Sequence, residues 1–271
     1  MSYIKNFLAL INNFKYGYGT SDKVKIFLHN ILYIILYPVN RFSFLFFKKH
    51  AIHPKFFFNG FKVKNSDGLF ICRDNVDLDV VSEDFEYDIR KYFKTFKKGI
   101  FVDIGANIGK YTIMISNQVK GTEKIISIEP HPENFEILEK NIGLNNCKSV
   151  ILLNLACWNK KGVLKLYSHE NQPLLASAVR PSKNYIKVNS NSLDNILKKM
   201  KIKNVDLIKI DVEGAESNVL EGMENVLKSG KAKIIFEAWN DVYLASCRKI
   251  LQNYNYKIKH LDKMYWIGFH K

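Results

Sequence analysis

A buried strand that turns through two glycines into a helix is the feature that most constrains this sequence. The apolar run 100–104 leads into the loop 105–109, Gly-Ala-Asn-Ile-Gly, and helical spacing begins at Lys110. Such a unit is typical of the first βα unit of a doubly wound sheet. Because position 107 is Asn, the loop lacks the middle glycine of the GxGxxG pattern that serves dinucleotides, and we expect a ligand without a pyrophosphate.

The chain after this loop alternates short apolar strands with helical periodicity. We predict strands at 125–129, 150–155, 163–167, 205–211 and 233–237, helices at 110–118 and 242–254, another helix after Gly214, and a closing hairpin formed by 256–260 and 265–269. This alternation favours βαβ units around a parallel sheet, so the expected fold class is α/β. Before the loop, the pattern predicts a small β region within 60–72 and a helix over 85–96.

The N-terminal part differs in charge from the remainder. The chain has a formal net charge of +15, and residues 1–64 contain ten Lys or Arg against one acid, Asp22. We therefore divide the chain into a basic, hydrophobic extension of helical and β character, residues 1–84, and a main domain, residues 85–271. A basic surface attracts anionic lipid, nucleic acid or phosphorylated substrates, and the alternative is a solvated face that keeps the protein soluble.

An uncharged stretch lies inside this extension. Residues 26–40 carry no formal charge, but they contain Pro38 and number only 15, whereas a membrane-spanning helix needs about 20 apolar residues. An aromatic run at 42–47 and Lys48-Lys49 follow. Two interpretations stay open: residues 24–49 contact the surface of an anionic membrane, or they form a helix that packs on the protein's own core or on a second subunit of a homo-oligomer.

The cysteines bear on the compartment. Cys72, Cys147, Cys157 and Cys247 show neither CxxC nor Cys/His ligand spacing, so we predict buried free thiols rather than disulfides or a zinc site. No convincing signal peptide precedes them. The sequence therefore favours the cytoplasm, with peripheral membrane contact if residues 24–49 act at a membrane surface.

Two acids stand at the ends of the first two predicted core strands. Glu129 follows Gly109 by twenty residues, and an acid at this position commonly accepts hydrogen bonds from both ribose hydroxyls. Asp103 lies at the end of the first strand, where a carboxylate organises the loop or faces a cationic amino-acid group. Loop and acid together favour a nucleoside-type ligand.

Three segments together resemble the FkbM family of methyltransferases: 101–109 (FVDIGANIG), 128–130 (IEP) and 208–216 (IKIDVEGAE). The likeness covers roughly residues 85–270, and residues 1–84 match no pattern. The resemblance implies a Rossmann-like class I methyltransferase fold with a seven-stranded, mostly parallel sheet and helices on both faces. It also implies S-adenosylmethionine as the methyl donor and hydroxyl groups of sugars or natural products as acceptors.

The predicted site residues gather where the strands end. The predicted cofactor-binding residues are Asp103, Gly105, Ala106, Asn107, Gly109, Glu129, Pro130, His131, Ala156 and Asp211, and the predicted catalytic residues are Asp211, Glu213 and Glu237. One of these carboxylates would take the hydroxyl proton as the C–O bond forms. For Asp211 and Glu213 the alternative is to cap the helix that starts near Ala215.

Four further residues have two interpretations each. Trp158 and Asn159 flank the adenine or pack structurally, and Lys209 orients a carboxylate or forms an ion pair at the edge of the core. His131 contacts the ligand or lies in a surface turn. The pair Asp211 and Glu213 lacks a third ligand, so no metal site is predicted.

The sequence thus predicts an S-adenosylmethionine-dependent O-methyltransferase that acts on a hydroxyl of a sugar, glycan, glycolipid or similar small molecule. The positive charge suggests an RNA methyltransferase as an alternative, but the signature of amino-group methylation and a recognisable RNA-binding module are both missing from the sequence, so nucleic acid is not the expected partner. A catalytically inactive, membrane-associated protein on the same fold is the other alternative.

Overall fold

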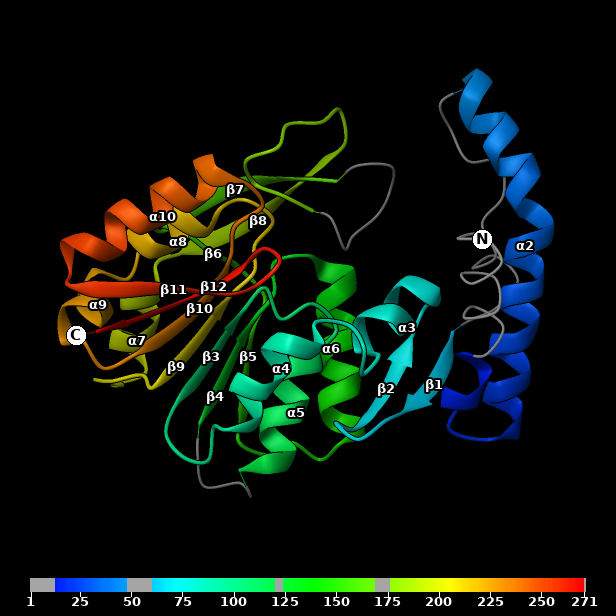
Figure 1. Cartoon of the computed structure of the whole chain (residues 1–271), viewed down its shortest axis with the longest axis horizontal. Coiled ribbons are helices and arrows are strands. Elements are labelled where there is room, and N and C mark those ends of the chain that lie inside the picture. Colours follow the sequence, from blue (N-terminus) through cyan, green and yellow to red (C-terminus); the bar gives the residue numbers. More distant parts are fainter. Residues whose placement is uncertain (1–12, 48–59, 120–123, 169–175, 271) are drawn as a thin grey trace. The chain divides into compact units, whose positions relative to one another are not determined.

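The computed structural model of the chain describes residues 13–47, 60–119, 124–168 and 176–270 (Figure 1). The chain forms two compact units, Met1–Phe85 and Glu86–Lys271. Each unit has its own elements and its own buried residues. The assignment of different roles to the extension and the main domain stays a prediction.

The first unit combines helices with a hairpin. Its elements are η1 (Asn13–Tyr16), α2 (Thr20–Phe47), β1 (Phe61–Lys64), β2 (Leu69–Cys72) and α3 (Asn75–Val81). β1 and β2 pair antiparallel, as the alternating pattern predicts, and Phe61, Phe70 and Leu78 are fully buried. The helix α3, which was not expected, begins where the Asp74 carboxylate accepts the Val76 and Asp77 backbone N–H groups.

The uncharged stretch lies in the long helix α2. This helix covers most of residues 24–49, and Lys48 and Lys49 lie outside the described residues. Pro38 lies inside the helix. Within the described ranges, no helix combines the length and the apolar content needed to cross a bilayer.

The second unit is built on a seven-stranded sheet. Its strands are β3 (Phe101–Ile104), β4 (Ile125–Ile128), β5 (Val150–Leu153), β9 (Leu207–Ile210), β10 (Lys233–Glu237), β11 (Tyr256–Asp262) and β12 (Tyr265–His270). They lie in the order β11-β12-β10-β9-β3-β4-β5. The five strands from β10 to β5 are parallel to one another, and β12 runs antiparallel to both of its neighbours. The expected mostly parallel, Rossmann-like sheet with a terminal hairpin is confirmed.

Helices cover both faces of this sheet. They are α4 (Tyr87–Lys94), α5 (Lys110–Gln118), α6 (Pro132–Leu144), α7 (Leu193–Lys199), α8 (Glu216–Glu221), α9 (Glu224–Ser229) and α10 (Asp241–Asn253) (Figure 1). Side chains alternate along each strand. Val102 and Ile104 therefore join the core formed with α7, α8, α9 and α10, whereas Phe101 joins the core formed with α4 and α5.

A small second sheet lies beside the main one, in the order β6-β8-β7, with β6 (Ala156–Cys157), β7 (Gly162–Tyr167) and β8 (Tyr185–Asn191). The predicted strand 150–155 thus ends early, at Leu153, because Ala156 and Cys157 pair with β8 instead. The strand β8 and the helix α7 were not expected. β8 contains Lys, Asn and Ser among its apolar residues, which made it resemble a loop.

Candidate active site

The glycine loop joins β3 to α5 and lies against the segment that follows β9. Gly105 has a φ of 79°, and a Cβ at this position would lie 1.8 Å from the Asp211 carbonyl oxygen. The N–H groups of Gly105 and Ala106 donate to the Ile128 carbonyl, and that of Gly109 donates to the Ala106 carbonyl. These three amides are therefore engaged by the protein itself. Gly105 therefore serves close backbone approach, whereas Gly109 makes room for the side chain of Leu138.

Glu129, directly after β4, faces the glycine loop. Its Oε2 accepts the Asn107 N–H at 2.9 Å, and its Oε1 accepts the His131 N–H at 3.0 Å. Burial raises the pKa of Glu129 to about 7, although these two N–H groups act to lower it. The predicted position of this acid beside the loop is thus present in the structure.

The neighbouring segment is held by a residue that the sequence did not single out. Asn154 donates from Nδ2 to the carbonyl oxygens of Glu129 and Pro130, at 2.9 and 3.3 Å. His131 is buried and lies at the N-terminus of α6, where it precedes Pro132. It is therefore not a surface histidine.

Asp103 belongs to the interior of the unit. Its side chain is 1% exposed, and its Oδ2 accepts the Thr112 hydroxyl at 2.7 Å. The Thr112 hydroxyl is also hydrogen-bonded to Ser127 of β4. Burial raises the pKa of Asp103, and the charge of Lys209 opposes this effect. Of the two roles considered, this position supports organisation of β3 and α5 rather than contact with a cationic ligand.

Asp211, just after β9, is held by a cation and a phenol. Lys209 Nζ lies 3.0 Å from Asp211 Oδ2 and 4.0 Å from Asp103 Oδ1. The Tyr265 hydroxyl lies 3.3 Å from Asp211 Oδ2 and also donates to Glu86. Lys209 therefore orients a carboxylate, one of its two expected roles.

Glu86 was missed in the sequence because it lies far from the motifs. Its carboxylate accepts the hydroxyls of Tyr265 and Tyr111, the latter at 2.6 Å. Its φ of 56° is in the left-handed region. It links the segment before β3 to a residue that follows it by 179 positions.

Glu213 and Glu237 form the other side of the site. Arg180 Nη2 lies 3.0 Å from Glu213 Oε2, and its guanidinium lies over the Trp239 ring, 4.1 Å from the centroid. The Trp239 indole N–H donates to Glu237. Arg180 and Trp239 thus connect the two predicted catalytic carboxylates, and neither was anticipated.

These two carboxyl groups hold protons more strongly than usual. Burial, reinforced by the charge of Asp211, raises the pKa of Glu213 to about 8 and that of Glu237 to about 9. At neutral pH both are therefore largely protonated. Asp211, which Lys209 holds by an ion pair, is the candidate proton acceptor among the three predicted catalytic residues.

Glu216, the first residue of α8, binds the turn that precedes this helix. Its Oε1 accepts the backbone N–H groups of Val212 and Gly214, at 3.1 and 3.2 Å. The helix itself begins without a side-chain cap. The alternative that Asp211 or Glu213 caps α8 is therefore wrong.

Three further residues of the sequence analysis lie in β6 or directly after it. Ala156 is buried and pairs with Ser190 of β8. The Trp158 backbone N–H donates to Asn191, and Asn159 Nδ2 donates to Glu221 at 3.0 Å. These contacts favour the structural alternative for Trp158 and Asn159, whereas the cofactor contact of Ala156 stays a prediction.

The described residues also contain no group of three or more His, Cys, Asp or Glu side chains arranged to hold a metal ion. Asp211 and Glu213 therefore gain no third ligand there.

The chain is similar in sequence to known methyltransferases. The sequence profile of the "Methyltransferase FkbM domain" matches residues 103–258, more than half of the chain. Methyltransferase sdnD of Sordaria araneosa is 26% identical over 170 residues, which cover 51% of this chain and 65% of that protein. Hexuronic acid methyltransferase AglP of Haloferax volcanii is 27% identical over 129 residues, which cover 47% and 51%. The match thus spans between half and two-thirds of these relatives' length.

Among solved structures, an FkbM methyltransferase from Methylobacillus flagellatus superimposes with a TM-score of 0.47 at 15% identity, covering 99% of this chain and 60% of that one.

Proposed function

Since the chain belongs to the FkbM methyltransferase family, we propose that it transfers the methyl group of S-adenosylmethionine to a hydroxyl oxygen of a sugar, glycan, glycolipid or similar small molecule. The named activity of a relative, hexuronic acid methyltransferase, supports a sugar as the acceptor class. The geometry of the second unit supports this proposal.

One observation carries the proposal: the glycine loop touches Glu129 on one side and Asp211 on the other. Asn107 donates its N–H to the Glu129 carboxylate, and Gly105 lies against the Asp211 carbonyl. An acid that binds ribose hydroxyls and an acid that accepts a proton therefore stand at the two sides of one short loop. This is the arrangement that a nucleoside donor and a hydroxyl acceptor require.

The residues present fit the donor. Asn107 Oδ1 is buried and has no hydrogen-bond partner among the described residues, so it remains available to a ligand. Glu129 retains lone pairs for hydroxyl donors beside the two N–H groups that it accepts. The loop presents no free amide at Gly105, Ala106 or Gly109 for a phosphate, which suits an adenosine without one.

The chain's own residues then have to align and deprotonate the acceptor. When bound, S-adenosylmethionine supplies an already activated methyl group. Asp211 takes the acceptor's proton, and Lys209 and Tyr265 hold its carboxylate in place. The protonated Glu213 and Glu237 add no full negative charge at neutral pH. The remaining contribution to the rate comes from alignment of the acceptor hydroxyl with the methyl–sulfur axis.

The direct test is transfer of labelled methyl from S-adenosylmethionine into fractionated cell extract that separates lipid-linked, free-glycan and RNA pools. We expect label in a glycan pool with the wild type and none with Asp211→Asn. Label in RNA would replace the acceptor class by the RNA alternative. Absence of S-adenosylmethionine binding by a folded wild type would support the inactive alternative.

We also propose that α2 binds the surface of an anionic membrane. Seven apolar residues recur every three or four positions, so they form one stripe along the helix: Val24, Leu28, Ile31, Ile35, Val39, Phe42 and Phe46. Six of them are between 45% and 68% exposed, and Ile31 is half-buried. An apolar stripe of this length on a helix too polar to span a bilayer suits an interface.

The charges beside the stripe favour lipid over a second copy of the chain. Lys23 and Lys25 lie about 100° to either side of Val24, given 3.6 residues per turn. The one acid of α2, Asp22, accepts the Lys62 N–H. In a dimer formed through this stripe, acids on one helix would pair with the lysines of the other. Attraction to an anionic bilayer requires only cations on the helix.

Flotation of the full chain with vesicles tests this proposal. We expect retention by phosphatidylglycerol-containing vesicles, little by phosphatidylcholine alone, and loss of retention in Ile35→Asp. Val242→Asp, which changes an exposed apolar residue of α10, should keep it. Equal behaviour of the two variants, or dimerisation without vesicle binding, would contradict the membrane proposal.

The state of the cysteines bears on the cellular compartment of the protein. All four are buried and free, which suits a reducing environment such as the cytoplasm.

A further inference from the structure

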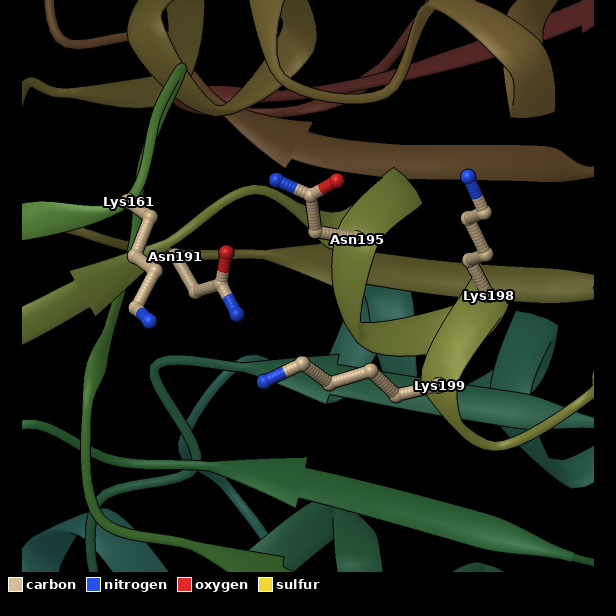
Figure 2. A pocket seen from close by; sticks show the side chains of 5 residues that line it. All are labelled: Lys161, Asn191, Asn195, Lys198 and Lys199. Carbon is tan, nitrogen blue, oxygen red and sulfur yellow. The ribbon is translucent and has the colours of Figure 1, made fainter.

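The second unit contains a pocket that none of the candidate site residues lines. It has a volume of about 430 Å³ and is bordered by Lys161, Asn191, Asn195, Lys198 and Lys199 (Figure 2). The turn before β7 supplies Lys161, the end of β8 supplies Asn191, and α7 supplies the other three. Every one of these side chains carries hydrogen-bond donors, and none is acidic.

The frame of the pocket is fixed by the backbone. Gly162 pairs with Ser190 in the β7–β8 ladder, and the Ser190 hydroxyl donates to the Lys160 carbonyl at 3.2 Å. Lys161 is thereby held beside the end of β8. The helix α7 follows β8 directly and starts where the Ser192 hydroxyl accepts the Asn195 N–H.

Asn191 is the buried donor of this pocket. Only 7% of the residue is exposed. Its Oδ1 accepts the Ser192 N–H at 3.0 Å, which fixes the orientation of the amide. Its Nδ2 donates to none of the described residues. In Figure 2 the Asn191 amide nitrogen lies between the ammonium groups of Lys161 and Lys199.

The lysines of the pocket have no carboxylate partner. Among the described residues, no salt bridge involves Lys161, Lys198 or Lys199. Asp194, the acid next to Asn195, is engaged by the backbone N–H groups of Asn225 and Val226. The positive charge around Asn191 is therefore not neutralised by the protein.

We infer that this pocket binds a sugar-sized anion, in which a carboxylate, phosphate or sulfate group meets the Asn191 amide and the ammonium groups of Lys161 and Lys199. Two cations and a buried N–H donor match the charge and the acceptor capacity of an oxyanion. The volume lies within the range of about 300–1,000 Å³ that is usual for small-molecule sites. It leaves room for the sugar that carries the anion.

If the proposed function holds, this pocket has a role in binding the acceptor. An acidic glycan could place one unit in this pocket while a hydroxyl of another unit is methylated. That role rests on the proposed function, whereas binding of the anionic sugar does not. Binding can therefore be measured without the methyl donor, so that a failure of one inference is distinguishable from a failure of the other.

Calorimetric titration of the full chain at low salt tests the inference. The probes are glucuronic acid, glucose 6-phosphate and neutral glucose. We expect at least one acidic sugar to bind and glucose not to bind, and the acidic sugar that binds identifies carboxylate or phosphate as the group recognised. The double variant Lys161→Ala/Lys199→Ala should weaken binding by at least about tenfold, since each charge-assisted hydrogen bond contributes on that scale.

A charge-matched control distinguishes a site from general attraction. The double variant Lys249→Ala/Lys257→Ala removes two exposed lysines that do not line the pocket and should bind like the wild type. Asn191→Asp, which places a carboxylate in the pocket, should abolish binding. Equal weakening by both double variants, binding of glucose as strong as that of the acids, or no binding of either acid would overturn the inference.

Discussion

Lys209 and Asp211 form an ion pair at the end of β9, with 3.0 Å between Nζ and Oδ2. Lys209 is almost fully buried and also faces Asp103. Burial alone would lower the pKa of Lys209, but the two carboxylates raise it above its usual value. The lysine therefore stays charged and compensates the negative charges of Asp103 in the core and Asp211 in the candidate site.

We predict that Lys209→Met destabilises the protein by about 3–5 kcal/mol, because it leaves a buried carboxylate without its cation. Urea unfolding followed by circular dichroism measures this change. The exposed Lys249→Met is the control and should stay within about 0.5 kcal/mol of the wild type. A loss of stability as small as that of the control would show that Lys209 does not support the buried carboxylates.

Gly105→Ala should prevent S-adenosylmethionine binding and destabilise the unit, because its Cβ would meet the Asp211 carbonyl at 1.8 Å. Gly143→Ala is the matched control. A Cβ at Gly143, inside α6, meets no atom within 4 Å, so this change should stabilise by about 0.5–1 kcal/mol through helix propensity. Thermal unfolding and calorimetric titration report both effects, and the same sign of stability change for both variants would contradict this account.

Glu129→Ala should weaken S-adenosylmethionine binding by about ten- to a hundredfold, the equivalent of one or two charge-assisted hydrogen bonds. The exposed Glu133→Ala, on α6, controls for the loss of negative charge near the loop. Binding is measured by calorimetric titration. Undiminished affinity in Glu129→Ala would remove the ribose role of this acid.

The stability of the ligand-free protein should fall as the pH rises from about 5 to 9. The folded-state pKa of Glu237 is raised to about 9, so the folded state holds a proton that the unfolded state has lost in this window. The favourable contribution of this proton is complete below the unfolded pKa and is lost as the pH passes the folded one. Glu237→Gln retains an acceptor for Trp239 and should flatten the decline in unfolding free energy, whereas Glu133→Gln should not. If the unfolding free energy of Glu237→Gln declined with pH as steeply as that of the wild type, a group other than Glu237 would be responsible for the decline.

Binding of S-adenosylmethionine at pH 7.5 should release protons. A sulfonium cation near Glu213 and Glu237 favours their ionised forms and lowers both pKa values from about 8 and 9. Titrations in buffers of different ionisation enthalpy count the protons. S-adenosylhomocysteine, which lacks the positive sulfur, should release fewer, and equal release by the two ligands would contradict this placement of the sulfonium.

Local sequence patterns were sufficient for the framework of the site. The strand before Gly105, the glycine loop and Glu129 all lie within one βαβ unit, so their spacing alone predicted that loop and acid would meet. The seven-stranded, mostly parallel sheet followed from the family resemblance. These features depend on residues that are close in the sequence.

The remaining parts of the site come from tertiary contacts that spacing does not encode. The Tyr265 hydroxyl contacts both Asp211 and Glu86, and Glu86 precedes Tyr265 by 179 residues. Arg180 reaches Glu213 from a segment without a recognised motif. The backbone amides of Gly105 and Ala106 could be assigned to Ile128 only once the register of β3 against β4 was known.

The position of β12 has a consequence for the order in which the site is made. β12 inserts between β10 and β11, and it brings Tyr265 to Asp211. A ribosome adds Tyr265 after Glu86, Lys209 and Asp211, so a nascent chain contains Asp211 before the phenol that contacts it. Until then β10 is an open edge, which is a surface that invites pairing with other chains. Contact of Tyr265 with Asp211 and pairing of the β10 edge therefore arise in the same step.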